Sequence, residues 1–163
     1  MENAFIAENA RERQRLKMLV ARLTDAQLAL TFPYGWTVAM ALAHLAFWDH
    51  RSFIALQKIK AGQKAAEPLD YDTINDALVP LCRAIAPREA ARLALAAAEK
   101  VDADLATITA EEAVAVEAAG ERARLYRCVH RNMHLDEIEA LIGYDGFVGA
   151  GLKPAPTGHA DFN

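Results

Sequence analysis

Residues 125–141 read LYRCVHRNMHLDEIEAL, and this stretch sets the fold prediction for the whole chain. It holds no glycine or proline, and its apolar residues recur at helical spacing, which predicts a long amphipathic helix. His130 and His134 stand at positions i and i+4 of that helix, where one metal ion can bind both imidazoles. The helical wheel predicts that the pair faces inward on an apolar arc with Tyr126, Val129, Met133, Ile138 and Leu141. The opposite, solvent-facing side is predicted to carry Glu121, Asn132, Asp136 and Glu139.

Working outward, glycine and proline gather at a few junctions and divide the chain into about four helical blocks, with no strand-like alternation. Thr24-Asp25 restarts a short turn after the first block, and Thr37 can cap the second. The expected helices are about 3–23, 37–61, 73–85, 87–108 and 121–142. The helices 73–85 and 87–108 are expected to form one interrupted third column that ends at Thr109 or Thr107, and a weakly structured stretch is expected after it. We predict one all-α domain over 1–143, and an irregular tail over 144–163 that packs on the domain or trails from it.

The size and net charge of the chain limit the classes of protein to which it can belong. A chain of 163 residues with a formal net charge of −4 fits one domain and argues against a nucleic-acid partner. No apolar run reaches the length of a membrane span, and the acidic, polar start does not resemble a signal peptide, so we expect a cytoplasmic protein with no membrane partner. Cys82 and Cys128 have no metal-binding spacing and are expected to be small buried thiols.

A third histidine, His44, lies on the second predicted helix. The wheel predicts an inward face that it shares with Thr37, Met40, Ala41, Phe47, Trp48 and Arg51, with Asp49, His50, Gln57 and Lys60 on the other side. A lone histidine on an apolar face is more often a hydrogen-bonded core residue than a ligand. Three inward histidines on two helices favour a shared metal ion with an open fourth position. The zinc-protease motif H-E-x-x-H is absent, because Arg131 stands where its glutamate would be.

Two segments resemble the signatures of the DinB-like superfamily, also called YfiT-like, which includes the N-terminal domain of mycothiol-dependent maleylpyruvate isomerase. They are residues 35–49, GWTVAMALAHLAFWD, and residues 130–141, HRNMHLDEIEAL. The resemblance implies an up-down-down-up four-helix bundle whose zinc or nickel ligands match His44, His130 and His134. It also implies a small-molecule substrate, because the members include transferases and isomerases that use low-molecular-weight thiols, and hydrolases of reactive small molecules. This chain departs from the family pattern in having Met133 and Asp136-Glu137 where a histidine and Gly-Gln are usual.

The departures shape the expected chemistry. A bound metal ion can activate a thiol or water to attack a small electrophile. Glu137 is the candidate general base, fourth metal ligand or hydrogen-bond partner of a ligand. The alternative is that Glu137 is a solvated or salt-bridged helix residue. Arg127 or Arg51 is expected to meet an anionic group of the substrate. Trp36, Phe47 and Trp48 are candidates for a pocket wall or for core packing. The basic stripe of Arg124, Arg127 and Arg131 is expected to be a solvated face.

Three functions from different classes follow. The first is a metal-dependent enzyme, a thiol transferase or hydrolase, that uses a low-molecular-weight thiol or water. The second is a protein that binds or sequesters a small molecule without turnover. The third is a metal-free bundle that acts through oligomer contacts, as in a homodimer.

Overall fold

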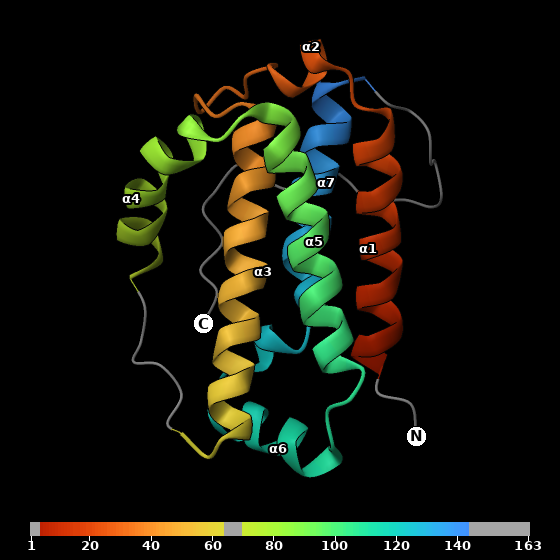
Figure 1. Ribbon diagram of the computed structural model, residues 1–163, viewed down its shortest axis with the longest axis vertical. Helices are drawn as coiled ribbons and strands as arrows, with labels where there is room; N and C mark the ends of the chain where they lie inside the picture. The colour runs from red at the N-terminus through yellow and green to blue at the C-terminus, as the bar shows by residue number, and fades with distance from the viewer. Residues whose placement is uncertain (1–3, 64–69, 144–163) are drawn as a thin grey trace.

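The computed structural model describes residues 4–63 and 70–143, and within these ranges it holds helices and no strand (Figure 1). The all-α prediction is therefore confirmed, while the predicted tail 144–163 lies outside the described residues. None of the described helices is both long and apolar enough to cross a membrane. The elements are α1 (Ala4–Arg22), α2 (Asp25–Leu28), α3 (Val38–Lys60), α4 (Tyr71–Ala84), α5 (Pro87–Leu105), α6 (Ala110–Ala118), the 3-10 turn η1 (Arg122–Arg124) and α7 (Arg127–Leu141).

Four long helices, α1, α3, α5 and α7, form the bundle. In Figure 1 α1 and α7 run upward while α3 and α5 run downward, which is the expected up-down-down-up order. Helix α1 packs against α7 and α5. Helix α3 packs most extensively against α5 and also contacts α7, which completes the four-helix bundle. The core between them includes Leu16, Leu19, Leu42, Leu45, Ala94, Leu135 and Ile138.

Local signals account for most of the helix ends. Thr24 forms a capping box with Gln27 at the start of α2. The Thr37 side chain accepts a hydrogen bond from the Met40 amide at the start of α3. Pro87 occupies the first turn of α5, where its missing amide hydrogen costs nothing. These ends lie where the sequence predicts them.

The predicted break before Pro87 is present, and it reverses the chain. Figure 1 shows α4 running upward beside α3 and α5 running downward in the bundle, so the two helices do not continue one column. Ile85 between them has an extended backbone, and neither Ile85 nor Ala86 has a helical ψ, since these angles are 130° and 136°. A proline disfavours helical angles in the residue before it, which is why the chain turns there.

The stretch after Thr109 differs from the prediction of weak structure, because it forms helix α6. Thr109 accepts a hydrogen bond from the Glu112 amide, and the Glu112 carboxylate accepts one from the Thr109 amide. A threonine followed three residues later by glutamate is a capping-box signal, and the prediction of weak structure did not take it into account.

Helix α7 begins at Arg127 and not at Glu121, where the sequence predicts it. The reason lies in α1: the buried Asn9 side chain accepts a hydrogen bond from the Cys128 amide and donates one to the Leu125 carbonyl, both at 2.7 Å. Asn9 thereby satisfies backbone groups at the start of α7 from another helix. A local sequence pattern cannot reveal a cap supplied from more than 100 positions away.

Candidate metal centre

The three histidines singled out by the sequence converge between α3 and α7. His44 comes from α3, and His130 and His134 come from successive turns of α7. Their ring centroids lie 4.8 to 5.2 Å apart, and one nitrogen from each ring lies within 4.8 Å of the others. Two helices from distant parts of the chain thus bring three possible ligands to one point.

His134 is held by a carboxylate on its own helix. Its Nδ1 lies 3.1 Å from a Glu137 carboxylate oxygen, which leaves Nε2 buried and without a hydrogen-bond partner among the described residues. A carboxylate on one ring nitrogen is the usual support for a histidine whose other nitrogen binds a metal. The same Glu137 oxygen accepts a hydrogen bond from the Tyr34 hydroxyl at 3.3 Å. Partial burial, followed by the charge of Glu137, raises the pKa of Tyr34 above its ordinary value.

His44 lies among aromatic rings. Trp36 and Trp48 meet its imidazole in edge-to-face geometry, with centroids 5.1 and 6.1 Å away. Burial lowers the pKa of His44 to about 3, and the neighbouring His134 and Arg127 add to the shift. The ring is therefore neutral at physiological pH, as a metal ligand must be.

His130 completes the cluster from the other side. Its Nε2 lies 3.3 Å from Nε2 of His44, and its Nδ1 lies 3.0 Å from the Arg127 guanidinium. Burial is the main reason that the pKa of His130 lies well below its ordinary value, and the charge of Arg127 lowers it further. His130 is thus also a neutral imidazole.

The geometry and the donor set fit a divalent transition metal. Two nitrogens bound to one tetrahedral zinc ion at about 2.0–2.1 Å lie roughly 3.3 Å from each other, which matches the separation of the two Nε2 atoms of His44 and His130. Imidazole nitrogens suit zinc, nickel and copper ions. Three such ligands leave a fourth position for a water or a substrate.

The prediction that Arg124, Arg127 and Arg131 form a solvated face is wrong. All three are buried, and Arg131 is 0% exposed. Asp49 bridges Arg127 and Arg131, with a 2.8 Å contact to each. Arg131 also contacts the Asp102 carboxylate of α5 at 2.8 Å. A guanidinium can be buried when carboxylates and carbonyls accept hydrogen bonds from its N–H groups, as they do for Arg131.

The prediction that Asp49 lies on the solvent side of α3 is also wrong, because the residue is only 1% exposed. Helix α3 packs against α5 on one side and α7 on another, so more than one of its faces is buried. The stretch Val38–Phe47, which carries no Asp, Glu, Lys or Arg, is the signal that could have indicated this. Glu12 of α1 is likewise buried, and it is paired with Arg11 and Arg15.

The predicted buried face of α7 is wrong at Val129. Val129, predicted to face inward, is 52% exposed, while the buried positions include Arg127, Cys128 and Leu135. The apolar arc therefore gives the right direction for His134 and Ile138 but not for Val129. The helix turns a polar face to the bundle because other helices supply carboxylates there.

The remaining predicted residues lie farther along α3. Trp48 is 5% exposed and its indole nitrogen donates a hydrogen bond to Asn75 at 3.1 Å, which places it in the packed interior beside His44. The guanidinium of Arg51 lies 5.6 Å from the Trp48 ring centroid. Its Nη1 atom is buried and has no hydrogen-bond partner within the described part of the chain. A substrate role for Trp48, Arg51 and Arg127 stays a prediction.

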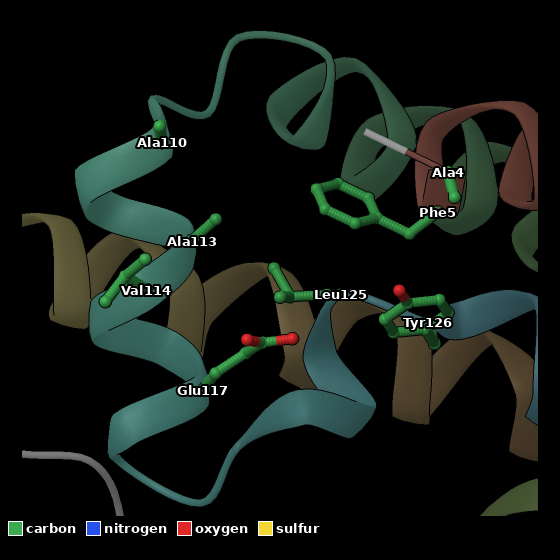
Figure 2. A pocket seen from close by; sticks show the side chains of 8 residues that line it. All are labelled: Ala4, Phe5, Ala110, Ala113, Val114, Glu117, Leu125 and Tyr126. Atoms are coloured by element: carbon green, nitrogen blue, oxygen red, sulfur yellow. The ribbon is translucent and has the colours of Figure 1, made fainter. Parts of the chain in front are cut away.

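A separate cavity of about 260 Å³ lies between the start of α1, helix α6 and the residues before α7 (Figure 2). Its walls are mostly apolar and include Phe5, Leu125 and Tyr126, with Glu117 as the charged group. The Glu117 carboxylate contacts Arg122 at 3.1 Å. None of the three histidines lines this cavity, so it is distinct from the candidate metal centre.

Tyr34 and Asp49 support the centre through Glu137 and Arg127, a role that was not predicted from the sequence. Tyr34 lies in the connector before α3 and reaches Glu137 over 103 positions of sequence. Asp49 is the last residue of the signature 35–49, but its role emerges only in the fold, where it holds Arg127 beside His130.

Comparison with known proteins bears on the fold and on the histidines. A family model described as the DinB superfamily matches residues 8–138, which is most of the chain and includes all three histidines. No curated protein and no solved structure matches the chain.

Proposed function

The chain belongs to the DinB superfamily, and from that premise we propose that it is a metal-dependent enzyme whose zinc or nickel ion is held by His44, His130 and His134. The convergence of the three imidazoles carries the proposal, since their ligand nitrogens lie within 4.8 Å of one another. Burial of a histidine nitrogen without a partner is unfavourable, and Nε2 of His134 and Nδ1 of His44 are in that position among the described residues. A metal ion would satisfy the first of them directly.

When bound, such an ion supplies Lewis acidity that makes a water or a thiol nucleophilic at neutral pH. The protein's own residues then orient the reactants. Glu137 fixes the His134 ring through Nδ1 and, with 40% of its side chain exposed, can accept a proton from a nucleophile. Tyr34, whose hydroxyl already donates to Glu137, can redirect that hydrogen bond to a substrate oxygen.

The substrate class we propose is a small electrophile with an anionic group. Arg51 is the candidate to bind that anionic group. Its guanidinium lies against Trp48, and its Nη1 has no hydrogen-bond partner among the described residues. The nucleophile is a low-molecular-weight thiol or water. A relation to the N-terminal domain of mycothiol-dependent maleylpyruvate isomerase would favour the thiol.

Metal analysis tests the centre. Protein purified without an affinity tag should retain a stoichiometric divalent ion, and His44→Ala and His130→Ala should each lose it. His50→Ala is the matched control, because His50 is an exposed histidine on the same helix. Wild-type protein that neither retains nor takes up zinc or nickel, with unchanged stability in His44→Ala, would contradict the proposal and support a metal-free bundle.

Turnover separates an enzyme from a binding protein. The loaded protein would be incubated with bacillithiol, mycothiol or glutathione and halogenated or epoxide acceptors, and product would be followed by mass spectrometry. We expect product in wild-type protein and not in Glu137→Ala. Metal binding without product formation for any pair would favour sequestration of a small molecule.

A further inference from the structure

His130 differs from the other two histidines in what contacts its Nδ1 atom. That atom lies 3.0 Å from Nη2 of Arg127. A guanidinium has donors and no acceptor, so the Nδ1 lone pair must accept this hydrogen bond. In a neutral imidazole the proton then sits on the other nitrogen, Nε2, which is the atom that faces the centre of the cluster.

The contacts of the other two rings agree with this assignment. Nε2 of His130 lies 3.3 Å from Nε2 of His44, so in the metal-free protein a proton on His130 Nε2 can be donated to the Nε2 lone pair of His44. His44 then carries its own proton on Nδ1. His134 donates Nδ1–H to the Glu137 carboxylate and keeps a lone pair on Nε2. Two of the three histidines therefore present a lone pair to the centre, while His130 presents a proton.

Arg127 is fixed where it stands. Its Nε donates to Asp49 at 2.8 Å and its Nη1 donates to the Ala123 carbonyl at 3.3 Å. Arg127 is 4% exposed and Asp49 is 1% exposed, so neither side chain can turn to water without breaking the buried pair. Asp49 is itself held by Arg131 on its second oxygen.

We propose that Arg127 is a positioning residue that holds His130 in the tautomer whose Nε2, the nitrogen facing the centre, is protonated and cannot bind the metal, which makes His130 the labile ligand of the centre. This inference rests on the proposed metal site. Ligation by all three histidines requires the His130 proton to move from Nε2 to Nδ1 and the guanidinium to withdraw from Nδ1, with no proton gained or lost. A ligating histidine usually donates its outer N–H to an acceptor, and disturbing that contact typically weakens metal binding about 10–100-fold. Here a donor occupies the place of the acceptor.

The tautomer can be measured directly in metal-free wild-type protein. Long-range ¹H–¹⁵N NMR of the histidine rings distinguishes a protonated Nε2 from a protonated Nδ1. We expect His130 to carry its proton on Nε2, and His44 and His134 to carry theirs on Nδ1. A His130 ring protonated on Nδ1 overturns the proposal, whatever any variant does.

The effect on metal affinity is tested with Arg127→Gln. The glutamine carbonyl can accept a hydrogen bond from Nδ1–H, so zinc affinity, measured by competition with a chromogenic chelator, should rise about 10-fold or more. Arg124→Gln is the matched control, because Arg124 is a buried arginine three positions earlier whose partners are Ser52 and Glu121. Its zinc affinity should equal that of wild type.

Unchanged or weaker zinc binding in an Arg127→Gln protein with wild-type circular dichroism would refute the role of Arg127. Absence of zinc binding in both wild type and variant would instead refute the metal centre. The tautomer in the metal-free protein decides the placement of the proton in either case, including when the variant does not fold.

Discussion

Replacing Arg131 with methionine tests whether paired charges hold α3, α5 and α7 together. The guanidinium is 0% exposed and contacts the carboxylates of Asp49 and Asp102, each at 2.8 Å. It also donates to the carbonyls of Asn9 and Ala98, at 3.3 and 3.4 Å. Methionine has a similar length and no donor, so the variant loses the charge and the hydrogen bonds while filling much of the same space.

The expected loss follows from the carboxylates that remain. Asp49 keeps Arg127, and Asp102 keeps the partly exposed Arg13 at 3.6 Å, so each stays buried with weaker compensation. Removing one partner of a buried ion pair typically costs about 3–5 kcal/mol. For a domain of this size that corresponds to a fall in melting temperature of roughly 6–20 °C.

Urea unfolding followed by far-ultraviolet circular dichroism measures the loss. Arg92→Met is the control, because Arg92 forms an exposed pair with Glu89 on α5 and should leave the midpoint unchanged. Adding Asp102→Asn to Arg131→Met should recover part of the stability, since it removes an undercompensated charge. A loss below about 1 kcal/mol for Arg131→Met would refute the reasoning, because it would mean that the buried pairs contribute no more than surface pairs do.

Three further perturbations have defined outcomes. The folded pKa of His44 is about 3 and an unfolded histidine titrates near 6.5, so the unfolded state binds more protons below pH 6.5. The metal-free protein should therefore lose about 1.3 kcal/mol of unfolding free energy through His44 between pH 7 and 5.5, and His44→Ala should lack that part of the pH dependence in urea unfolding. Glu137→Ala removes the acceptor of the His134 ring and should weaken zinc binding about 10–100-fold in a chelator competition, whereas equal affinity would contradict the supporting role of Glu137. Gly62→Ala places a side chain at φ +71° where α3 ends and should cost roughly 1–2 kcal/mol in thermal unfolding, so a variant as stable as wild type would show that the end of α3 does not need this conformation.

Features encoded by neighbours in sequence could be predicted, and features encoded by the fold could not. The caps at Thr24 and Thr37, the start of α5 at Pro87 and the inward side of His44 depend on a few adjacent residues or on helical period. The start of α7 depends on Asn9 in α1, and no window around residue 121 contains that information.

The charged interior shows the same limit. A helical wheel assigns polar residues to water because it treats a helix as having one buried face. Helix α3 has buried faces toward both α5 and α7, so Asp49 is enclosed. Each arginine of α7 is then buried because a carboxylate from another helix meets it. The burial of such a pair is a joint property of two helices, and neither sequence segment shows it alone.

The polar face of α7 links stability to the candidate metal centre. Asp49 contacts Arg131 through one oxygen and Arg127 through the other, and Arg127 contacts His130. The same carboxylate therefore pairs with Arg131, which is 0% exposed, and fixes the guanidinium that faces a candidate metal ligand. An apolar core at this position would pack α7 as well, but it could not hold an imidazole in one orientation and one tautomer. The buried charges are best understood as the support that positions His130, with their desolvation offset by pairing across three helices.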